Sequence, residues 1–141
     1  MKHLEAIIEI NAPPKAVWEV LVDFSSYAEW NPFIISMQGQ VGVGEMLQET
    51  IRQPDGKIVP LKSRILTVEP MQKLEWEGYF GAPFLFSGRH SLILEASPGG
   101  TRFIQKEIFT GLALFLMDVD AILPGYHQMN QTLKARVERT S

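Results

Sequence analysis

The stretch FSSYAEWNPFI, residues 24–34, packs aromatic rings and large apolar side chains around serine, asparagine and proline. SSYAEW within it fits one helical turn, because a serine at the N-cap accepts a hydrogen bond from a free N–H group. Pro32 ends that turn, since the residue before a proline is disfavoured in the helical region. We therefore interpret the stretch as the join between a helical segment and a strand, with Phe24 and Trp30 anchored in the core.

The residues before this join predict a strand and then a short amphipathic helix. In HLEAIIEIN (3–11), apolar and mostly polar residues alternate, which is typical of a strand with one buried face. Prolines follow at 13 and 14, and they suit the first turn of a helix, where the missing N–H has no partner to lose. Apolar residues then recur at helical spacing at Val17, Val20, Leu21 and Phe24.

The residues after the join predict six strands and a long C-terminal helix. Short turns separate FIISMQ, MLQETIR, VPLKSRILTV, LEWEGYF, FLFSGRHSLILE and TRFIQKEIFTG, so neighbouring strands are antiparallel. Near the end, a continuous apolar stripe runs through Ile122, Tyr126, Met129, Leu133 and Val137, and we expect Pro124–Gly125 to kink or split that helix. The fold class is α+β, in one domain spanning residues 1–141. A helix laid across a curved sheet leaves a concave apolar space, so we expect a pocket for an apolar or amphipathic ligand.

Composition and charge exclude several classes of function. The net charge is −3 and no basic run is present, which argues against a nucleic-acid partner. The chain lacks cysteine, and His3, His90 and His127 show no metal-binding spacing, so we expect no metal and no cofactor. The longest apolar run, 112–117, is too short to span a bilayer, and the N-terminus lacks a signal-peptide pattern. We expect a cytoplasmic protein without an integral membrane segment, as a monomer or homodimer.

Two long segments resemble one known superfamily. IEINAPPKAVWEVLVDFSSYAEWNPFI is similar to the N-terminal signature of the START-like or SRPBCC superfamily, and SGRHSLILEASPGGTRFIQKEIFTG to its final hairpin. Within the superfamily, the chain resembles the polyketide cyclase/dehydrase-like proteins. The resemblance implies a helix-grip fold: a curved seven-stranded antiparallel sheet wrapped around a long C-terminal helix, with two short helices between the first two strands. Relatives include lipid carriers, hormone receptors, quinone-binding proteins, chaperone activators and aromatase/cyclases.

His90 and Glu107 are the polar candidates for a site. Alternation places His90 on an otherwise apolar strand face, and Glu107 shares a face with Phe103 and Gln105 on the next strand. These side chains could satisfy each other or water, orient the polar end of a ligand, or act as a general acid/base pair. All three interpretations stay open at this point.

Aromatic residues near the GAP loop (81–83), the join and the segment LALFLM (112–117) predict an apolar mouth to the pocket. Ordinary core packing is the alternative for these rings, Trp76 above all. The candidate ligand-binding residues are Tyr27, Phe33, Trp76, Phe80, Phe84, Phe86, His90, Phe103, Gln105, Glu107, Phe115, Met117, Ile122, Tyr126 and Met129.

These features favour a non-enzymatic carrier or sensor that holds a lipid, a quinone or a polycyclic aromatic between the sheet and the C-terminal helix. One alternative is a cyclase- or dehydratase-like enzyme that uses His90 with Glu107 and needs neither metal nor nucleotide. A second alternative is a protein-interaction module of the chaperone-activator type, which would expose a large apolar patch.

Overall fold

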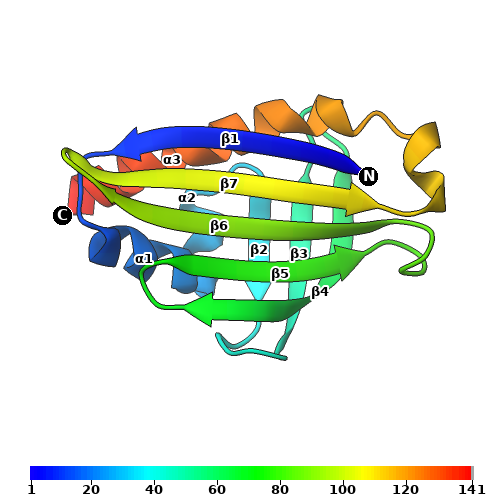
Figure 1. Ribbon diagram of the computed structural model, residues 1–141, viewed down its shortest axis with the longest axis horizontal. Coiled ribbons are helices and arrows are strands. Elements are labelled where there is room, and N and C mark those ends of the chain that lie inside the picture. Colours follow the sequence, from blue (N-terminus) through cyan, green and yellow to red (C-terminus); the bar gives the residue numbers. More distant parts are fainter. Residues whose placement is uncertain (141) are drawn as a thin grey trace.

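A computed structural model describes residues 1–140 of the chain, and in these residues a curled sheet holds one long helix (Figure 1). The chain begins with a strand, two short helices and a helical turn, which are β1 (Lys2–Ile10), α1 (Pro14–Val22), η1 (Phe24–Ser26) and α2 (Tyr27–Trp30). Six strands follow: β2 (Ile34–Gln38), β3 (Met46–Arg52), β4 (Ile58–Glu69), β5 (Lys73–Tyr79), β6 (Ser87–Ser97) and β7 (Gly100–Thr110). The chain ends with η2 (Leu112–Leu116), η3 (Val119–Ile122) and α3 (Leu123–Thr140).

The seven described strands form one antiparallel sheet in the order β1-β7-β6-β5-β4-β3-β2. Strands β2 to β7 pair with their neighbours in the chain, whereas β1 crosses back to pair with β7, so that Lys2 lies opposite Phe109. The predicted α+β helix-grip fold is therefore confirmed, including the two short helices between the first two strands.

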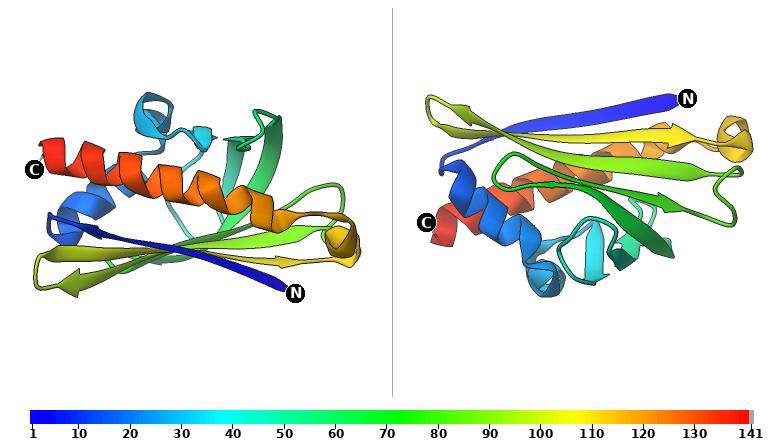
Figure 2. Two further views of the ribbon diagram at one scale, coloured as in Figure 1. Left: turned by 90° about the horizontal axis from the view of Figure 1, so that it is seen from above. Right: turned by 60° about the horizontal axis from the view of Figure 1, so that its bottom comes forward.

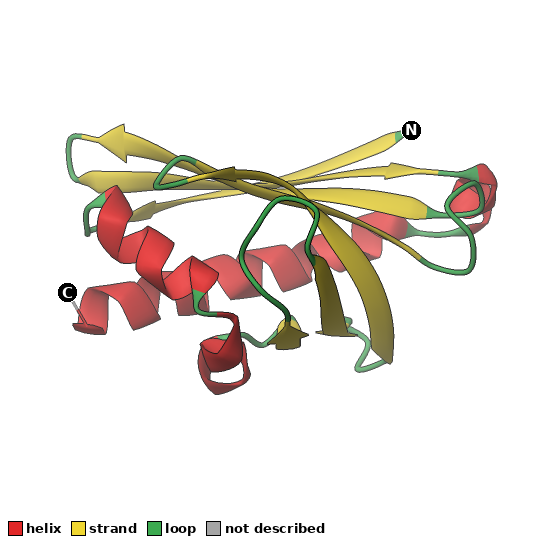
Figure 3. Cartoon of the chain, turned by 90° about the horizontal axis from the view of Figure 1, so that it is seen from below, coloured by secondary structure: helices red, strands yellow, loops and turns green. Residues whose placement is uncertain are grey.

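All three α-helices lie on the concave side of the sheet. Figure 2 shows α3 running along the sheet, with the part formed by β2, β3 and β4 turned up beside it. Figure 3 shows α1 and α2 on the same side, near the C-terminal half of α3. The predicted apolar stripe of α3 faces inward, since Tyr126, Met129, Leu133 and Val137 are all at most 1% exposed.

The side chain of Asn31 holds the join at residues 24–34. The Oδ1 atom of Asn31 accepts hydrogen bonds from the N–H groups of Phe33, at 3.0 Å, and Ile34, at 2.8 Å. Asparagine commonly bonds the backbone two or three residues ahead in this way and so directs a turn. The Tyr27 ring packs edge to face against Phe24 and Trp30, and its hydroxyl donates to the Leu21 carbonyl oxygen. The stretch is thus a buried corner, as predicted.

Two details of the predicted elements are wrong: a kink or split in the last helix and the start of one strand. Pro124 and Gly125 do not kink or split α3, because they lie in its first turn, where a proline breaks no hydrogen bond. Gly125 has a packing role there: a Cβ atom at this position would lie 2.5 Å from the Phe33 ring. Strand β6 begins at Ser87 rather than at Phe84, because residues 81–85 form a turn-rich loop.

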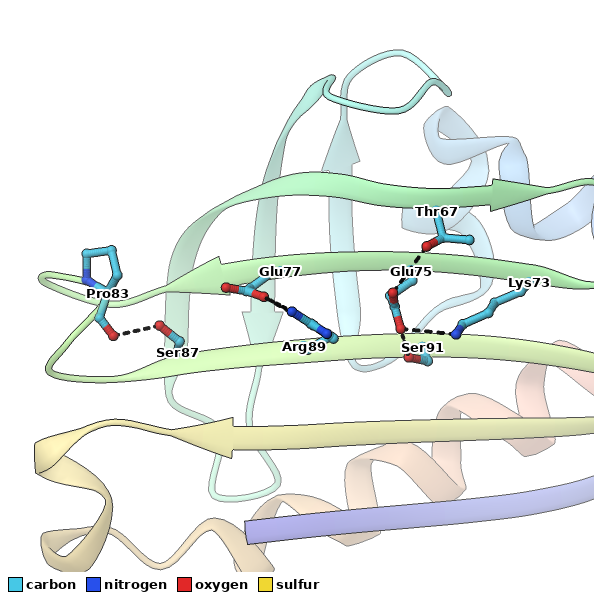
Figure 4. Close-up of polar contacts among 8 residues, drawn as sticks. All are labelled: Thr67, Lys73, Glu75, Glu77, Pro83, Ser87, Arg89 and Ser91. Atoms are coloured by element: carbon cyan, nitrogen blue, oxygen red, sulfur yellow. Dashed lines mark hydrogen bonds and ion pairs between the residues drawn. The ribbon is translucent and has the colours of Figure 1, made fainter. Parts of the chain in front are cut away.

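The face of the sheet away from α3 carries polar pairs across β4, β5 and β6 (Figure 4). Arg89 donates to the Glu77 carboxylate, with Nη2 and Oε2 3.0 Å apart. Glu75 accepts from Ser91, at 2.7 Å, and from Thr67, at 3.2 Å. Exposed ion pairs of this kind add little stability individually, so the concave face provides most of the stabilisation.

Candidate functional site

A cavity of about 350 Å³ lies between the concave face of the sheet and the beginning of α3. Its size is within the range of small-molecule sites, and most of its wall is apolar. The walls come from strands β3 to β7, the β3–β4 and β5–β6 connections and the first turns of α3. The lining residues are Phe33, Glu49, Ile51, Gln53, Lys57, Val59, Leu61, Ser63, Trp76, Gly78, Tyr79, Phe80, Phe86, Gly88, His90, Glu107, Phe109, Met117, Ile122 and Tyr126.

One end of the cavity is open and the other is buried. Lining residues of the β5–β6 connection and the segment before α3 are exposed, with Phe80 at 56% and Met117 at 44%. The β3–β4 hairpin adds Lys57, which is also exposed. Deep inside, by contrast, His90 is 4% exposed and Ser63 1%. A ligand would therefore enter past aromatic side chains and meet polar groups last.

The polar groups at the deep end include a connected network on β6, β7 and α3. The Tyr126 hydroxyl donates to Oε1 of Glu107 over 2.9 Å. The same oxygen lies 3.4 Å from Nδ1 of His90, and Nε2 of His90 lies 2.8 Å from Oε1 of Gln105. The Gln105 amide nitrogen donates to Oδ1 of Asn130 over 2.7 Å, which ties the network to α3.

The positions of these partners assign the protons. The Gln105 amide nitrogen lies 3.4 Å from the Tyr126 backbone carbonyl, which only accepts hydrogen bonds, so the amide oxygen faces His90. Nε2 of His90 must then be the donor to that oxygen. In the neutral imidazole, Nδ1 carries a lone pair that faces the Glu107 carboxyl.

Burial disfavours the charged form of both members of this pair. It lowers the pKa of His90 to about 4, although the hydrogen bond to Gln105 opposes the shift. It also raises the pKa of Glu107 well above its usual range, with the Tyr126 hydroxyl opposing and Glu49 adding to the rise. A protonated Glu107 carboxyl beside the free Nδ1 of His90 can donate a proton to it or to a ligand.

Glu49 is a second buried carboxyl in the cavity, and the sequence-based candidates omit it. Ser63 on the adjacent strand donates a hydrogen bond to its Oε1 atom. Burial raises the pKa of Glu49 to about 7, although hydrogen bonds from Ser63 and Trp76 oppose the shift. The signal for Glu49 was present in the sequence, since it alternates with the inward-facing Leu47 and Ile51 on β3.

Nine of the predicted ligand-binding residues line the cavity, and six do not. Those in the wall are Phe33, Trp76, Phe80, Phe86, His90, Glu107, Met117, Ile122 and Tyr126. Tyr27, Phe103, Gln105 and Met129 are buried in the core outside the wall. Phe84 and Phe115 are 67% and 83% exposed and also lie outside it, because Phe84 is in a loop and Phe115 in the short helix η2 rather than on an inward strand face. Gln105 reaches the site indirectly, by holding His90.

Residues 1–140 contain no group of three or more histidine, aspartate or glutamate side chains placed to bind a metal ion. In the same residues, no helix combines the length and the hydropathy needed to cross a membrane.

Comparisons with known proteins agree with this architecture. Among curated proteins, none has a sequence that matches the chain significantly. A protein of Mesorhizobium loti shares the fold with a TM-score of 0.77 and 19% identity, over 99% of each chain. The Zhui aromatase/cyclase of Streptomyces sp. R1128 has a TM-score of 0.78 and 16% identity, over 98% of this chain and 94% of its own. The di-domain aromatase/cyclase StfQ of the steffimycin biosynthetic pathway has a TM-score of 0.79 and 14% identity, over 98% of this chain and 51% of its own.

These structural similarities establish the fold, whereas a family model establishes the relationship. The model described as polyketide cyclase / dehydrase and lipid transport matches residues 1–138, which is nearly the whole chain. The cavity and its buried polar end fit a ligand-binding or cyclase-like protein. The chain belongs to the polyketide cyclase/dehydrase and lipid transport family of the SRPBCC superfamily.

Proposed function

We propose that the protein binds a hydrophobic or amphipathic small molecule in this cavity and acts as a carrier or sensor. The observation that carries the proposal is an apolar cavity of about 350 Å³ with an exposed mouth and a buried polar end. Lipids, quinones and polycyclic aromatics have the matching shape, since each combines a large apolar body with a small polar group.

The energetics of the cavity favour such a ligand. Each Å² of apolar ligand surface removed from water contributes roughly 25 cal/mol, and side chains such as Phe86 and Phe109 provide the apolar contact. These two rings already stack on each other, with their centroids 5.5 Å apart. Because the walls are held by the sheet and α3, little conformational ordering has to accompany binding.

A pair of variants tests the proposal. Leu61 lines the cavity on β4, and its neighbour Lys62 points to solvent. We expect Leu61→Trp to weaken uptake of the neutral fluorescent probe N-phenyl-naphthylamine strongly, because the indole takes up part of the cavity. Lys62→Trp adds the same ring outside and should leave uptake intact. Absence of probe uptake by the unmodified protein, or equal uptake by both variants, would contradict the proposal.

A cyclase- or dehydratase-like activity is a second candidate, favoured by the Glu107–His90 pair. A protonated carboxyl and a free imidazole nitrogen 3.4 Å apart supply both partners of acid–base catalysis. The nitrogen would take a proton from a carbon between two carbonyl groups, and the carboxyl would protonate a carbonyl oxygen. Such a pair contributes roughly 10²–10⁴-fold.

A synthetic linear poly-β-ketone, supplied as its N-acetylcysteamine thioester, tests this second candidate. We expect an aromatic product, followed by absorbance and mass, that His90→Gln suppresses while binding of the neutral probe persists. If the product forms at the rate of the protein-free reaction, the chain is a binding protein only.

A further inference from the structure

We propose that the deep end of the cavity selects a ligand whose buried polar group is a protonated amine, and that it rejects carboxylates such as fatty acids. This inference rests on the proposed binding function and narrows its ligand class. It is carried by two acidic side chains in the cavity wall, by their burial and by the hydrogen bonds that hold them.

Two acidic side chains face the cavity and no cation faces them from inside. Glu49 on β3 is 5% exposed and Glu107 on β7 is 8% exposed. Among the lining residues, all of which lie in the described part of the chain, Lys57 is the single lysine or arginine, and it is exposed on the β3–β4 hairpin at the mouth. His90 does not compensate either, because its Nε2 atom is bonded to Gln105 and burial keeps the ring neutral.

The other polar groups around the two carboxyls bring no positive charge either. Around Glu49 lie the Ser63 hydroxyl of β4 and the Trp76 indole of β5, and Glu107, His90 and Tyr126 complete the polar end from β6, β7 and α3. One further titratable group, the buried phenol of Tyr27 on α2, interacts with Glu49 electrostatically. None of these groups brings a positive charge at neutral pH.

A bound ammonium group would favour ionisation of Glu49 at this end of the cavity. Taking a charge out of water is unfavourable unless it is paired and hydrogen-bonded, so the empty site relieves its carboxyls by protonation. An ammonium group supplies both a charge and N–H donors, which lets Glu49 ionise. A carboxylate ligand would instead place like charges together in a low-dielectric space. A hydroxyl carries no charge, so it would neither attract nor repel an ionised Glu49.

The coupling predicts a specific pH dependence. The pKa of Glu49 in the empty protein is about 7, and an ammonium would return it toward the ordinary 4.5. Amine affinity should then rise roughly tenfold per pH unit between about pH 5 and 7, and level off above that. The affinity of a carboxylate should fall above about pH 7, where Glu49 ionises in the empty protein, and that of an alcohol should stay constant.

Three probes with the same chain test the inference: decylamine, decanol and decanoate, each displacing N-phenyl-naphthylamine from the unmodified protein. At pH 8 we expect decylamine to bind at least about tenfold more tightly than decanol, and decanoate at least about tenfold more weakly. Glu49→Gln should bring the amine close to the alcohol and flatten its pH profile. Glu45→Gln, which changes an exposed glutamate just before β3, is the matched control and should leave the series unchanged.

The probe series separates failure of this inference from failure of the proposed function. If decanol and the naphthylamine probe bind but decylamine gains nothing over decanol, the amine selectivity is wrong and the binding function stands. Decanoate binding as tightly as decylamine at pH 8 would also overturn the inference. If no probe binds at all, the proposed function itself fails, whatever the charge preference.

Discussion

The interior of the protein has a filled half and a hollow half, and α3 contributes to both. In its later turns, Leu133 and Val137 are fully buried in the core beside α1. In its first turn, Tyr126 borders the cavity instead, and Ile122 just before α3 does the same. The apolar stripe is continuous, and the cavity lies beside the start of the helix, next to the curled β3–β4 part of the sheet. Stability and ligand binding therefore depend on different turns of one helix.

Truncation in the filled half should have the largest effect on stability. Leu133→Ala leaves a cavity among tightly packed neighbours and should lower the free energy of unfolding by about 2–5 kcal/mol. Leu61→Ala in the hollow half should lower it by about 1–2 kcal/mol, because Leu61 is partly exposed and already borders open space. Chemical denaturation measures both. Equal losses would mean that the two halves do not differ in packing.

Glu49 should make the hollow half depend on pH. Its pKa is about 7 in the folded protein and near 4.5 when unfolded, so the folded state binds the proton more tightly. The stabilisation from this group is complete below about pH 4.5 and is lost as the pH rises toward 7, a loss of roughly 3 kcal/mol. We expect Glu49→Gln to remove this loss and to be more stable than the unmodified protein above pH 7.

The effect of His90 on stability has the opposite pH dependence, over an overlapping pH range. Its folded pKa of about 4 lies below the ordinary 6.5, so its contribution is complete above pH 6.5 and is lost as the pH falls toward 4. In the unmodified protein the two groups partly cancel between pH 4.5 and 6.5. Burial also raises the pKa of Glu107, which therefore acts in the same direction as Glu49. The unmodified protein should lose stability as the pH rises through this range, and Glu49→Gln should make that loss smaller, measured by urea denaturation across pH. An unchanged pH profile would contradict the assigned burial of Glu49.

Two tyrosine hydroxyls give a matched pair with a smaller effect. Tyr126→Phe removes the donor to Glu107 in the hollow half, and Tyr27→Phe removes the donor to the Leu21 carbonyl in the filled half. Each should lower the free energy of unfolding by about 1–2 kcal/mol, because a buried acceptor loses its partner. Only Tyr126→Phe should alter decylamine binding. An equal change in binding by both variants would show that the tyrosine effect is not local to the cavity.

The smallest effect is expected at the exposed end of the hollow half. Phe115 is 83% exposed and lies outside the cavity wall, so Phe115→Ser should change the free energy of unfolding by less than about 0.5 kcal/mol. The cavity-lining Phe86→Ser should destabilise more and weaken binding of the naphthylamine probe. Loss of probe binding by Phe115→Ser would instead extend the site to η2.

The periodic parts of the chain could be predicted from sequence, and the irregular parts could not. Alternation in β6 and β7 placed His90 and Glu107 inward, and the helical stripe of α3 placed Tyr126 inward, because each pattern has only one apolar face. Alternation fails once a strand ends. Phe84 was assigned to an inward face by extending β6 three residues too far into a loop.

The contacts between side chains of different strands and helices could not be predicted from the sequence pattern either. Gln105 of β7 bonds His90 and is itself held by Asn130 of α3, and these contacts depend on the register and on how the helix crosses the sheet. The sequence predicts Glu49 poorly for a different reason: a single acidic residue in a strand such as MLQETIR usually faces solvent, whereas Glu49 shares the buried face of Leu47 and Ile51.

The pairing of β1 with β7 has a consequence for the order in which the protein folds. Strands β2 to β7 can each pair with a strand just completed, so that part of the sheet can grow hairpin by hairpin during synthesis. Strand β1 is made before β7 and must wait for it, because Lys2 has no partner until Phe109 has been made. This long-range closure should be the slow step of folding, since its loop entropy is lost before any contact is gained. Until it occurs, the free edge of β7 is the place where a second nascent chain could add its own first strand.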